Sequence, residues 1–93
     1  MPVFRPAPSV LARQVGDELV LVNMDRNTIF SLNITAARIW ELWAEGRSQA
    51  EAVDELVLQF DVTRETAEAE SARLLAELRR EGLGDFADSD PAP

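Results

Sequence analysis

The sequence contains no cysteine and no histidine. Without cysteine the chain can form neither a disulfide nor a thiolate metal site, and a cytoplasmic protein is the simplest interpretation. Without histidine it lacks the most common general base and the most common metal ligand. No apolar run is long enough to span a bilayer, and the N-terminus does not have the basic and apolar regions of a secretion signal. We therefore expect no cofactor, no metal site and no membrane contact.

Basic residues are also few. Nine Lys and Arg stand against seventeen Asp and Glu, which gives a net charge of -8. The densest basic stretch, Arg79-Arg80, is flanked by Glu77 and Glu81. Binding to a nucleic acid requires a local basic patch that can neutralise phosphates, and an anionic membrane surface makes the same demand. The composition therefore disfavours both as partners.

The remaining pattern predicts three strands followed by three helices in one domain. The strands cover residues 10–15, 18–24 and 28–32, and short polar turns join them. The helices cover residues 34–44, 48–60 and 63–80, with Asn33, Ser48 and Thr63 as N-caps. Gly46 and Gly82 suit the ends of the first and third helices. This order predicts an α+β fold, specifically a winged helix-turn-helix with a three-stranded antiparallel N-terminal sheet.

The two ends of the chain differ in composition from this central domain. Residues 1–9 contain three prolines, and we expect a flexible arm there. Residues 84–93 are acidic and contain two more prolines, so we expect a disordered tail. The folded domain is accordingly expected to cover residues 10–83.

One junction is unusual because a strand passes into a helix with almost no loop. Residues 28–32 are strand formers, and Asn33 can cap the helix that follows directly. The apolar face of that helix is predicted to carry Ala36, Ile39, Trp40 and Trp43. Such a corner can hold the edge of a sheet open beside a helix.

The ordered motifs around this corner resemble the PqqD-like family of precursor-peptide recognition domains. They are Leu19-Val20-Leu21-Val22, Asp25-Arg26-Asn27, Ile29-Phe30, Leu32-Asn33, Thr35-Ala36-Ala37 and Ile39-Trp40. The resemblance continues through the Phe60-Asp61-Val62 break to Glu81-Gly82-Leu83 and so covers about residues 10–83. The family usually has a glycine where this chain has Asn27, which also accepts the left-handed conformation. The chain looks most like the freestanding recognition proteins of lasso-peptide pathways.

The resemblance implies that a leader peptide adds as a strand beside residues 28–32, in a cleft against the third helix. An unpaired sheet edge accepts an extended peptide on general physical grounds as well. The implied edge residues are Thr28, Ile29, Phe30, Ser31 and Leu32, and the implied facing wall is Ala67, Glu70, Ser71, Leu74 and Glu77. The small residues at 67 and 71 would leave room for a bulky leader side chain. Glu70 or Glu77 would pair with a basic residue of the leader.

Several of these residues also have a purely structural interpretation. Strand alternation should turn one pair of side chains to the core, and we expect Phe30 and Leu32 there, which leaves Ile29 as the better candidate for peptide contact. Leu74 is predicted to lie in the core rather than in a pocket, because periodic apolar positions on a helix are usually buried. Trp40 and Trp43 are expected to be packing residues.

The resemblance thus implies a non-catalytic protein that binds a precursor peptide and delivers it to a leader peptidase or another maturation enzyme. No serine has a histidine partner, no glycine-rich loop is present, and the carboxylates have ordinary solubilising spacing. One alternative is a winged-helix DNA-binding transcription regulator, although neither the second nor the third helix is basic. A second alternative is a structural accessory subunit without a peptide ligand.

Overall fold

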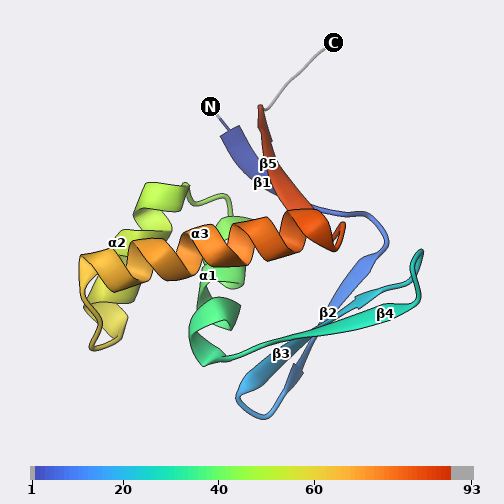
Figure 1. The fold of residues 1–93 in the computed structure, drawn as a ribbon, viewed down its shortest axis with the longest axis horizontal. Coiled ribbons are helices and arrows are strands. Elements are labelled where there is room, and N and C mark those ends of the chain that lie inside the picture. Colours follow the sequence, from blue (N-terminus) through green and yellow to red (C-terminus); the bar gives the residue numbers. More distant parts are fainter. Residues whose placement is uncertain (1, 89–93) are drawn as a thin grey trace.

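The computed structural model describes residues 2–88, which contain five strands and three helices (Figure 1). The strands are β1 (Pro2–Pro6), β2 (Val10–Val15), β3 (Glu18–Asn23), β4 (Thr28–Leu32) and β5 (Gly84–Asp88). The helices are α1 (Ile34–Ala44), α2 (Gln49–Gln59) and α3 (Arg64–Arg80). The predicted α+β class and the order of the central sheet and the helices are confirmed. No helix among the described residues has the length and apolar character needed to cross a membrane.

Strands β2, β3 and β4 form an antiparallel meander in that order. The register pairs Leu19 with Leu32 and Leu21 with Phe30, so these side chains share one face of the sheet. Leu19, Leu21 and Leu32 are buried, which identifies this face as the one that packs on the helices. Both β2 and β4 are edge strands of this sheet, and β4 is the one that leads directly into α1.

Each helix begins at the cap that its sequence predicts. The side chains of Asn33, Ser48 and Thr63 accept hydrogen bonds from the backbone N–H groups of the third residue that follows. Ser48 and Glu51 form a complete capping box. A cap of this kind typically stabilises a helix by about 1 kcal/mol. Helices α1 and α3 end before Gly46 and Gly82, whose φ angles of 100° and 69° lie in the left-handed region that favours glycine.

The termini form a second sheet that the sequence did not predict. Strands β1 and β5 pair antiparallel, with Phe4 opposite Phe86. The expected flexible arm and disordered tail are therefore wrong for residues 2–6 and 84–88. The rings of Phe4 and Phe86 pack against each other and against Trp43, with centroid separations of 5.1 to 5.4 Å. Burial of these aromatic rings outweighs the low strand propensity of the proline-containing segment. Residues 1 and 89–93 lie outside the described residues, and so does that part of the predicted tail.

Helix α1 lies at the centre of the molecule and contacts the sheets as well as α2 and α3 (Figure 1). The largest fully buried side chains come from the central strand β3, the three helices and the residue before β5: Leu21, Ile39, Leu42, Trp43, Leu56, Leu78 and Leu83. Trp40 and Trp43 are buried packing residues, as predicted. The core thus fixes α1 and α3 relative to β4, and these three elements surround the site described next.

Candidate functional site

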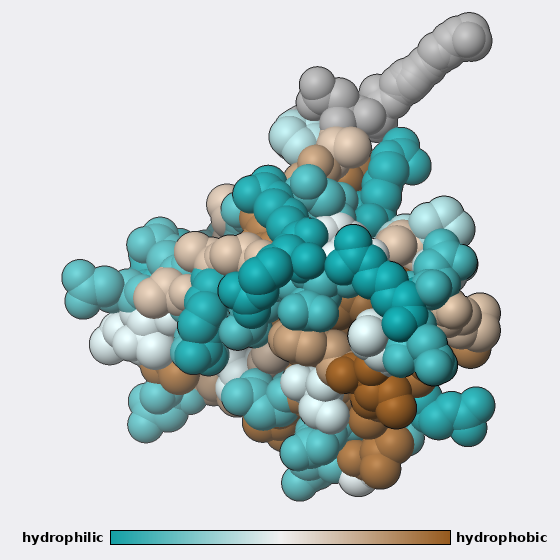
Figure 2. Space-filling view, turned by 45° about the vertical axis from the view of Figure 1, so that its right-hand side comes forward, coloured by the Kyte–Doolittle hydropathy of each residue, from teal (hydrophilic) through white to brown (hydrophobic). Residues whose placement is uncertain are grey.

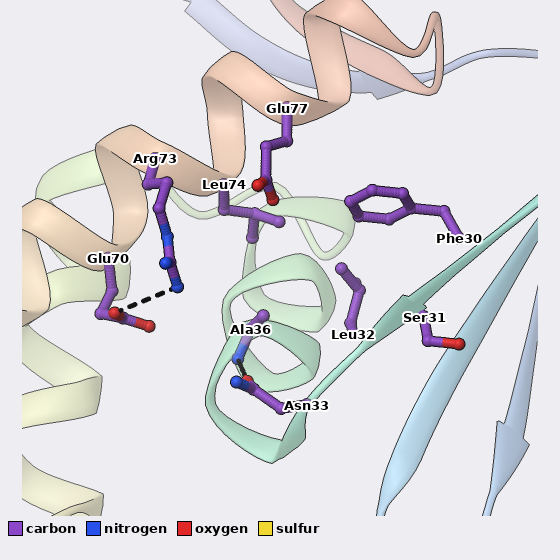
Figure 3. A pocket seen from close by; sticks show the side chains of 9 residues that line it. All are labelled: Phe30, Ser31, Leu32, Asn33, Ala36, Glu70, Arg73, Leu74 and Glu77. Atoms are coloured by element: carbon purple, nitrogen blue, oxygen red, sulfur yellow. Dashed lines mark hydrogen bonds and ion pairs between the residues drawn. The ribbon is translucent and has the colours of Figure 1, made fainter.

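A cavity of about 170 Å³ lies between β4, the first turn of α1 and the middle of α3 (Figure 3). Its position follows from the strand-to-helix corner, because Asn33 ends the strand and its side chain caps α1 within the same few residues. One edge of β4 is thereby left without a neighbouring strand, and α3 lies across the cavity from it. The cavity is lined by Phe30, Ser31, Leu32, Asn33, Ala36, Glu70, Arg73, Leu74 and Glu77.

Strand β4 borders this cavity with an unpaired edge. Within the described residues β4 pairs with β3 on one side and with no strand on the other. In an extended strand, alternate residues direct their N–H and C=O groups to opposite edges. The free edge therefore offers a row of backbone donors and acceptors that can pair with another extended chain.

Apolar side chains form part of the floor of the cavity, whose accessible lining is otherwise mostly polar. Leu32 from β4 and Leu74 from α3 are almost fully buried, while Phe30 and Ala36 are half-buried. Figure 3 shows the side chains of Phe30, Leu32 and Leu74 pointing toward one another across the cavity. Removing an apolar group from water stabilises its bound state in proportion to the area buried, at about 25 cal/mol per Å². This floor can therefore accept an apolar side chain.

The rim on α3 is charged. Arg73 and Glu70 form an ion pair with an N–O distance of 3.3 Å, one turn apart on the helix. Glu77 projects from the next turn, and Figure 3 shows its carboxylate directed toward the cavity beside Leu74. Among the described residues no ion pair involves Glu77. The three groups leave an excess negative charge at the rim, which favours a basic group in a ligand.

Of the ten residues that the sequence proposed for peptide contact, six line this cavity. They are Phe30, Ser31, Leu32, Glu70, Leu74 and Glu77. Thr28 and Ile29 belong to the same strand edge but lie outside the cavity. Ile29 is 72% exposed, but its register places it on the face of the sheet that points away from the helices, so its role as the better contact candidate stays a prediction. Phe30 is half-buried rather than fully buried, because its ring borders the cavity.

Two residues of the proposed facing wall belong elsewhere. Ala67 and Ser71 are 1% and 5% exposed and do not line the cavity. Helix α3 is rotated so that these small residues face the core, where they allow it to pack closely on its neighbours. The structure therefore does not bring these two residues to the cavity, and their contact with a leader side chain stays a prediction.

Three lining residues were absent from the proposed set: Asn33, Ala36 and Arg73. For two of them the sequence carried a signal. Asn33 was predicted as the helix cap and Ala36 as part of the apolar face of α1, so both were already placed at the corner. Arg73 is identified by the structure through its pairing with Glu70 on the cavity side of α3.

A second cavity of about 270 Å³ lies on another side of α1 and contains none of the proposed site residues. Its lining is Gln14, Asp17, Ile34, Ala37, Arg38, Glu41 and Phe60. Residues 2–88 contain no group of three or more acidic side chains arranged to hold a metal ion. The first cavity is thus the one that contains proposed peptide-contact residues.

Comparison with known proteins gives consistent results. The family model of coenzyme PQQ synthesis protein D (PqqD) matches residues 18–83, from β3 to just beyond α3. The solved structure of TbiB1 in complex with the TbiA(beta) leader peptide is 30% identical in sequence, with a TM-score of 0.81. The similarity covers 90% of this chain and 99% of TbiB1. A lasso peptide synthetase B1 complexed with the leader peptide is also 30% identical, with a TM-score of 0.81 and coverages of 87% and 95%. No curated protein matches the sequence.

Proposed function

Because this chain belongs to the PqqD family, we propose that it binds the leader segment of a ribosomally synthesised precursor peptide and delivers it to a maturation enzyme, in lasso peptide biosynthesis. The protein itself is non-catalytic in this proposal. The observation that carries it is the free edge of β4 facing α3 across a cavity, in a chain similar to two proteins solved with leader peptides.

The peptide would add as a strand along residues 28–32, the length of β4. Main-chain hydrogen bonds to the free edge would supply much of the affinity, and they would not depend on the side chains of the peptide. Alternate side chains of the peptide would point to the helix side, where the floor formed by Phe30, Leu32 and Leu74 accepts an apolar group. A basic side chain nearby would pair with Glu77 or Glu70 at the rim.

Delivery requires a surface for the partner enzyme as well as one for the peptide. The register aligns Leu11, Val22 and Ile29 in one row across the outer face of the sheet. Figure 2 shows hydrophobic side chains gathered at the lower right, in the part of the molecule that carries this sheet, while hydrophilic side chains cover most of the rest of this view. The row ends at β4, the edge where the peptide adds, so an enzyme bound to this row would also contact the peptide. Holding both together raises the effective concentration of the peptide at the enzyme.

We further propose a winged helix-turn-helix arrangement, in which β2, β3 and β4 stand in the place of the wing. The order of sheet and helices supports it, together with the short turn between α1 and α2. A DNA-binding regulator is the competing function for that arrangement, but a net charge of -8 opposes binding to phosphates. Capture of a newly synthesised precursor would take place in the cytoplasm.

Fluorescence anisotropy tests the proposal. A labelled leader segment, taken from a short precursor encoded near the gene, should bind saturably, whereas a scrambled leader and an unrelated DNA duplex should not. Binding of the duplex alone would overturn the proposal in favour of a regulator. Absence of binding to every probe would favour a structural subunit.

Two proline variants test strand addition. Ser31 and Thr28 are exposed, and their N–H groups point to opposite edges of β4 because their positions differ by an odd number. Proline removes the N–H group at each position. One of Ser31→Pro and Thr28→Pro should therefore weaken leader binding with the fold intact, whereas the other should destabilise pairing with β3. Circular dichroism separates the two effects, and wild-type affinity in both folded variants would contradict docking on this edge.

A third variant separates delivery from binding. Leu11→Ser changes the outer face at a residue of β2, away from the cavity. It should leave leader affinity unchanged while it slows cleavage of the precursor by the partner peptidase. Unchanged cleavage at limiting protein concentration would show that the enzyme docks elsewhere.

A further inference from the structure

The buried side chain of Asn23 connects three separate segments of the chain. Asn23 is the last residue of β3 and is only 2% exposed. Its Oδ1 atom accepts hydrogen bonds from the backbone N–H groups of Asp25 and Arg26, at 3.0 and 3.2 Å, and from the hydroxyl of Ser9 at 3.3 Å. Its Nδ2 atom donates to the carbonyl of Gly82 at 3.4 Å, immediately after α3. The turn between β3 and β4 is thus joined to the end of α3.

Arg26, in the same turn, makes a second connection. Its guanidinium donates to the carbonyl of Arg80 at 3.4 Å. The carbonyls of the last helical turn have no partners within the helix, and the C-terminal end of the helix dipole favours a positive charge. The guanidinium also lies directly over Gly82, where an added Cβ atom would come within 2.9 Å of Arg26 Cζ. A larger residue at position 82 would therefore require the end of the Arg26 side chain to move.

These two connections lie at one end of the groove between β4 and α3, which contains the cavity described above. At the other end, β4 runs straight into α1, which packs on α3. Between the two ends, no backbone hydrogen bond joins residues 28–32 to α3 in the described part of the chain. The separation of the two walls at the turn end therefore depends on what holds the turn to α3.

We propose that Asn23 and Arg26 are positioning residues that set the spacing between the free edge of β4 and the wall of α3, and so control peptide affinity from outside the cavity. The inference rests on the proposed function, because it concerns the same groove. Neither residue lines the cavity. When the hydrogen bonds from Asn23 and Arg26 to the end of α3 are lost, the turn between β3 and β4 can move relative to α3, with the Leu32–Asn33 corner as the pivot. A bound peptide must then restrict this movement, and binding becomes weaker by that cost.

Arg26→Ala is the decisive variant, because Arg26 is exposed and its removal should leave the fold intact. We expect its Kd for the leader to rise by about three- to tenfold, the effect of losing one hydrogen bond of typical net strength, since this bond is long and exposed. Arg26→Lys retains a cation and a donor and should recover most of the affinity. Arg47→Ala, which removes an exposed arginine between α1 and α2, is the matched control and should bind as wild type does.

Asn23→Asp isolates the other connection. The carboxylate keeps the acceptor for the two N–H groups of the turn but cannot donate to Gly82, so the same weakening is expected. If this variant fails to fold, the result with Arg26→Ala still tests the positioning role.

Groove spacing can be measured directly, because the absence of native cysteine allows clean labelling. Spin labels at Met24→Cys in the turn and Ala72→Cys on the exposed face of α3 report the distance across the groove by double electron–electron resonance. Arg26→Ala should broaden this distance distribution, and Arg26→Lys should narrow it again. This readout does not require a peptide, so it remains informative if wild-type protein fails to bind any leader, a result that would overturn the proposed function instead. An unchanged distance distribution, or an unchanged Kd in a protein that binds, would overturn the positioning role.

Discussion

Ala36 is the residue through which α1 borders the cavity, and its small size keeps the cavity open. Replacement by leucine retains high helix propensity and keeps the backbone N–H that Asn33 caps. We expect Ala36→Leu to raise Kd for the leader by about tenfold or more, since the larger side chain occupies the space that the peptide needs.

The stability of the same variant should change little, because the added atoms enter an open cavity rather than a closed core. Anisotropy titration and thermal unfolding measure the two effects separately. Ala72→Leu is the matched control, since it adds the same side chain on the exposed face of α3 and does not touch the cavity. Equal affinities of the two variants would show that the peptide does not enter this cavity.

At the scale of elements, α3 and β5 are joined by an ion pair between Arg79 and Asp85, whose Nε and Oδ1 atoms are 2.6 Å apart. The hydrogen bond from Arg79 lowers the pKa of Asp85, and the backbone N–H of Phe86 contributes in the same direction. Because the folded-state pKa is depressed, the pair stabilises the fold above the unfolded pKa of about 3.9. This stabilisation is lost as the pH falls through the folded-state pKa.

The Asp85 side chain is 55% exposed, so screening limits the contribution of the pair to at most about 1 kcal/mol. Wild type should therefore be slightly more stable than Asp85→Asn at pH 7, and the difference should disappear at pH 2. Urea denaturation at the two pH values measures it. In an NMR titration, Arg79→Gln should move the midpoint of Asp85 upward, and an unmoved midpoint would contradict the role of the guanidinium.

At the scale of the whole molecule, the two ends of the chain close over the same aromatic cluster. Phe4 lies 5.2 Å from Trp40 and 5.4 Å from Trp43, measured between ring centroids. Truncation of a buried phenylalanine costs about 3–5 kcal/mol, a large part of the 5–15 kcal/mol that stabilises a typical domain. We expect Phe4→Ala to lower the free energy of unfolding by this amount.

Urea denaturation followed by tryptophan fluorescence suits this test, because both tryptophans contact Phe4. Phe4→Leu fills more of the space and should lose less stability than Phe4→Ala. If Phe4→Ala were as stable as wild type, β1 would not be docked in solution, and the flexible arm expected from the prolines would be correct after all.

Local signals in the sequence were sufficient for the central elements. The alternation along residues 28–32 predicted that Phe30 and Leu32 face the helices, and Asn33, Ser48 and Thr63 marked where the helices begin. These features act within a few residues of the backbone, so a single sequence reveals them. The same local reasoning located the corner and the strand edge beside which the cavity lies, and the resemblance supplied the family.

Tertiary structure alone decided how these elements meet. The periodicity of α3 shows which residues share a face, but packing on α1 and α2 sets its rotation, which buries Ala67 and Ser71 and turns Glu70, Arg73 and Glu77 to the cavity. The pairing of β1 with β5 joins opposite ends of the chain, and no local window contains both partners. The sequence by itself therefore determined the elements and the free strand edge. The side of α3 that faces that edge, and the hydrogen bonds of Asn23 and Arg26 to the end of α3, depend on contacts between residues far apart in the chain.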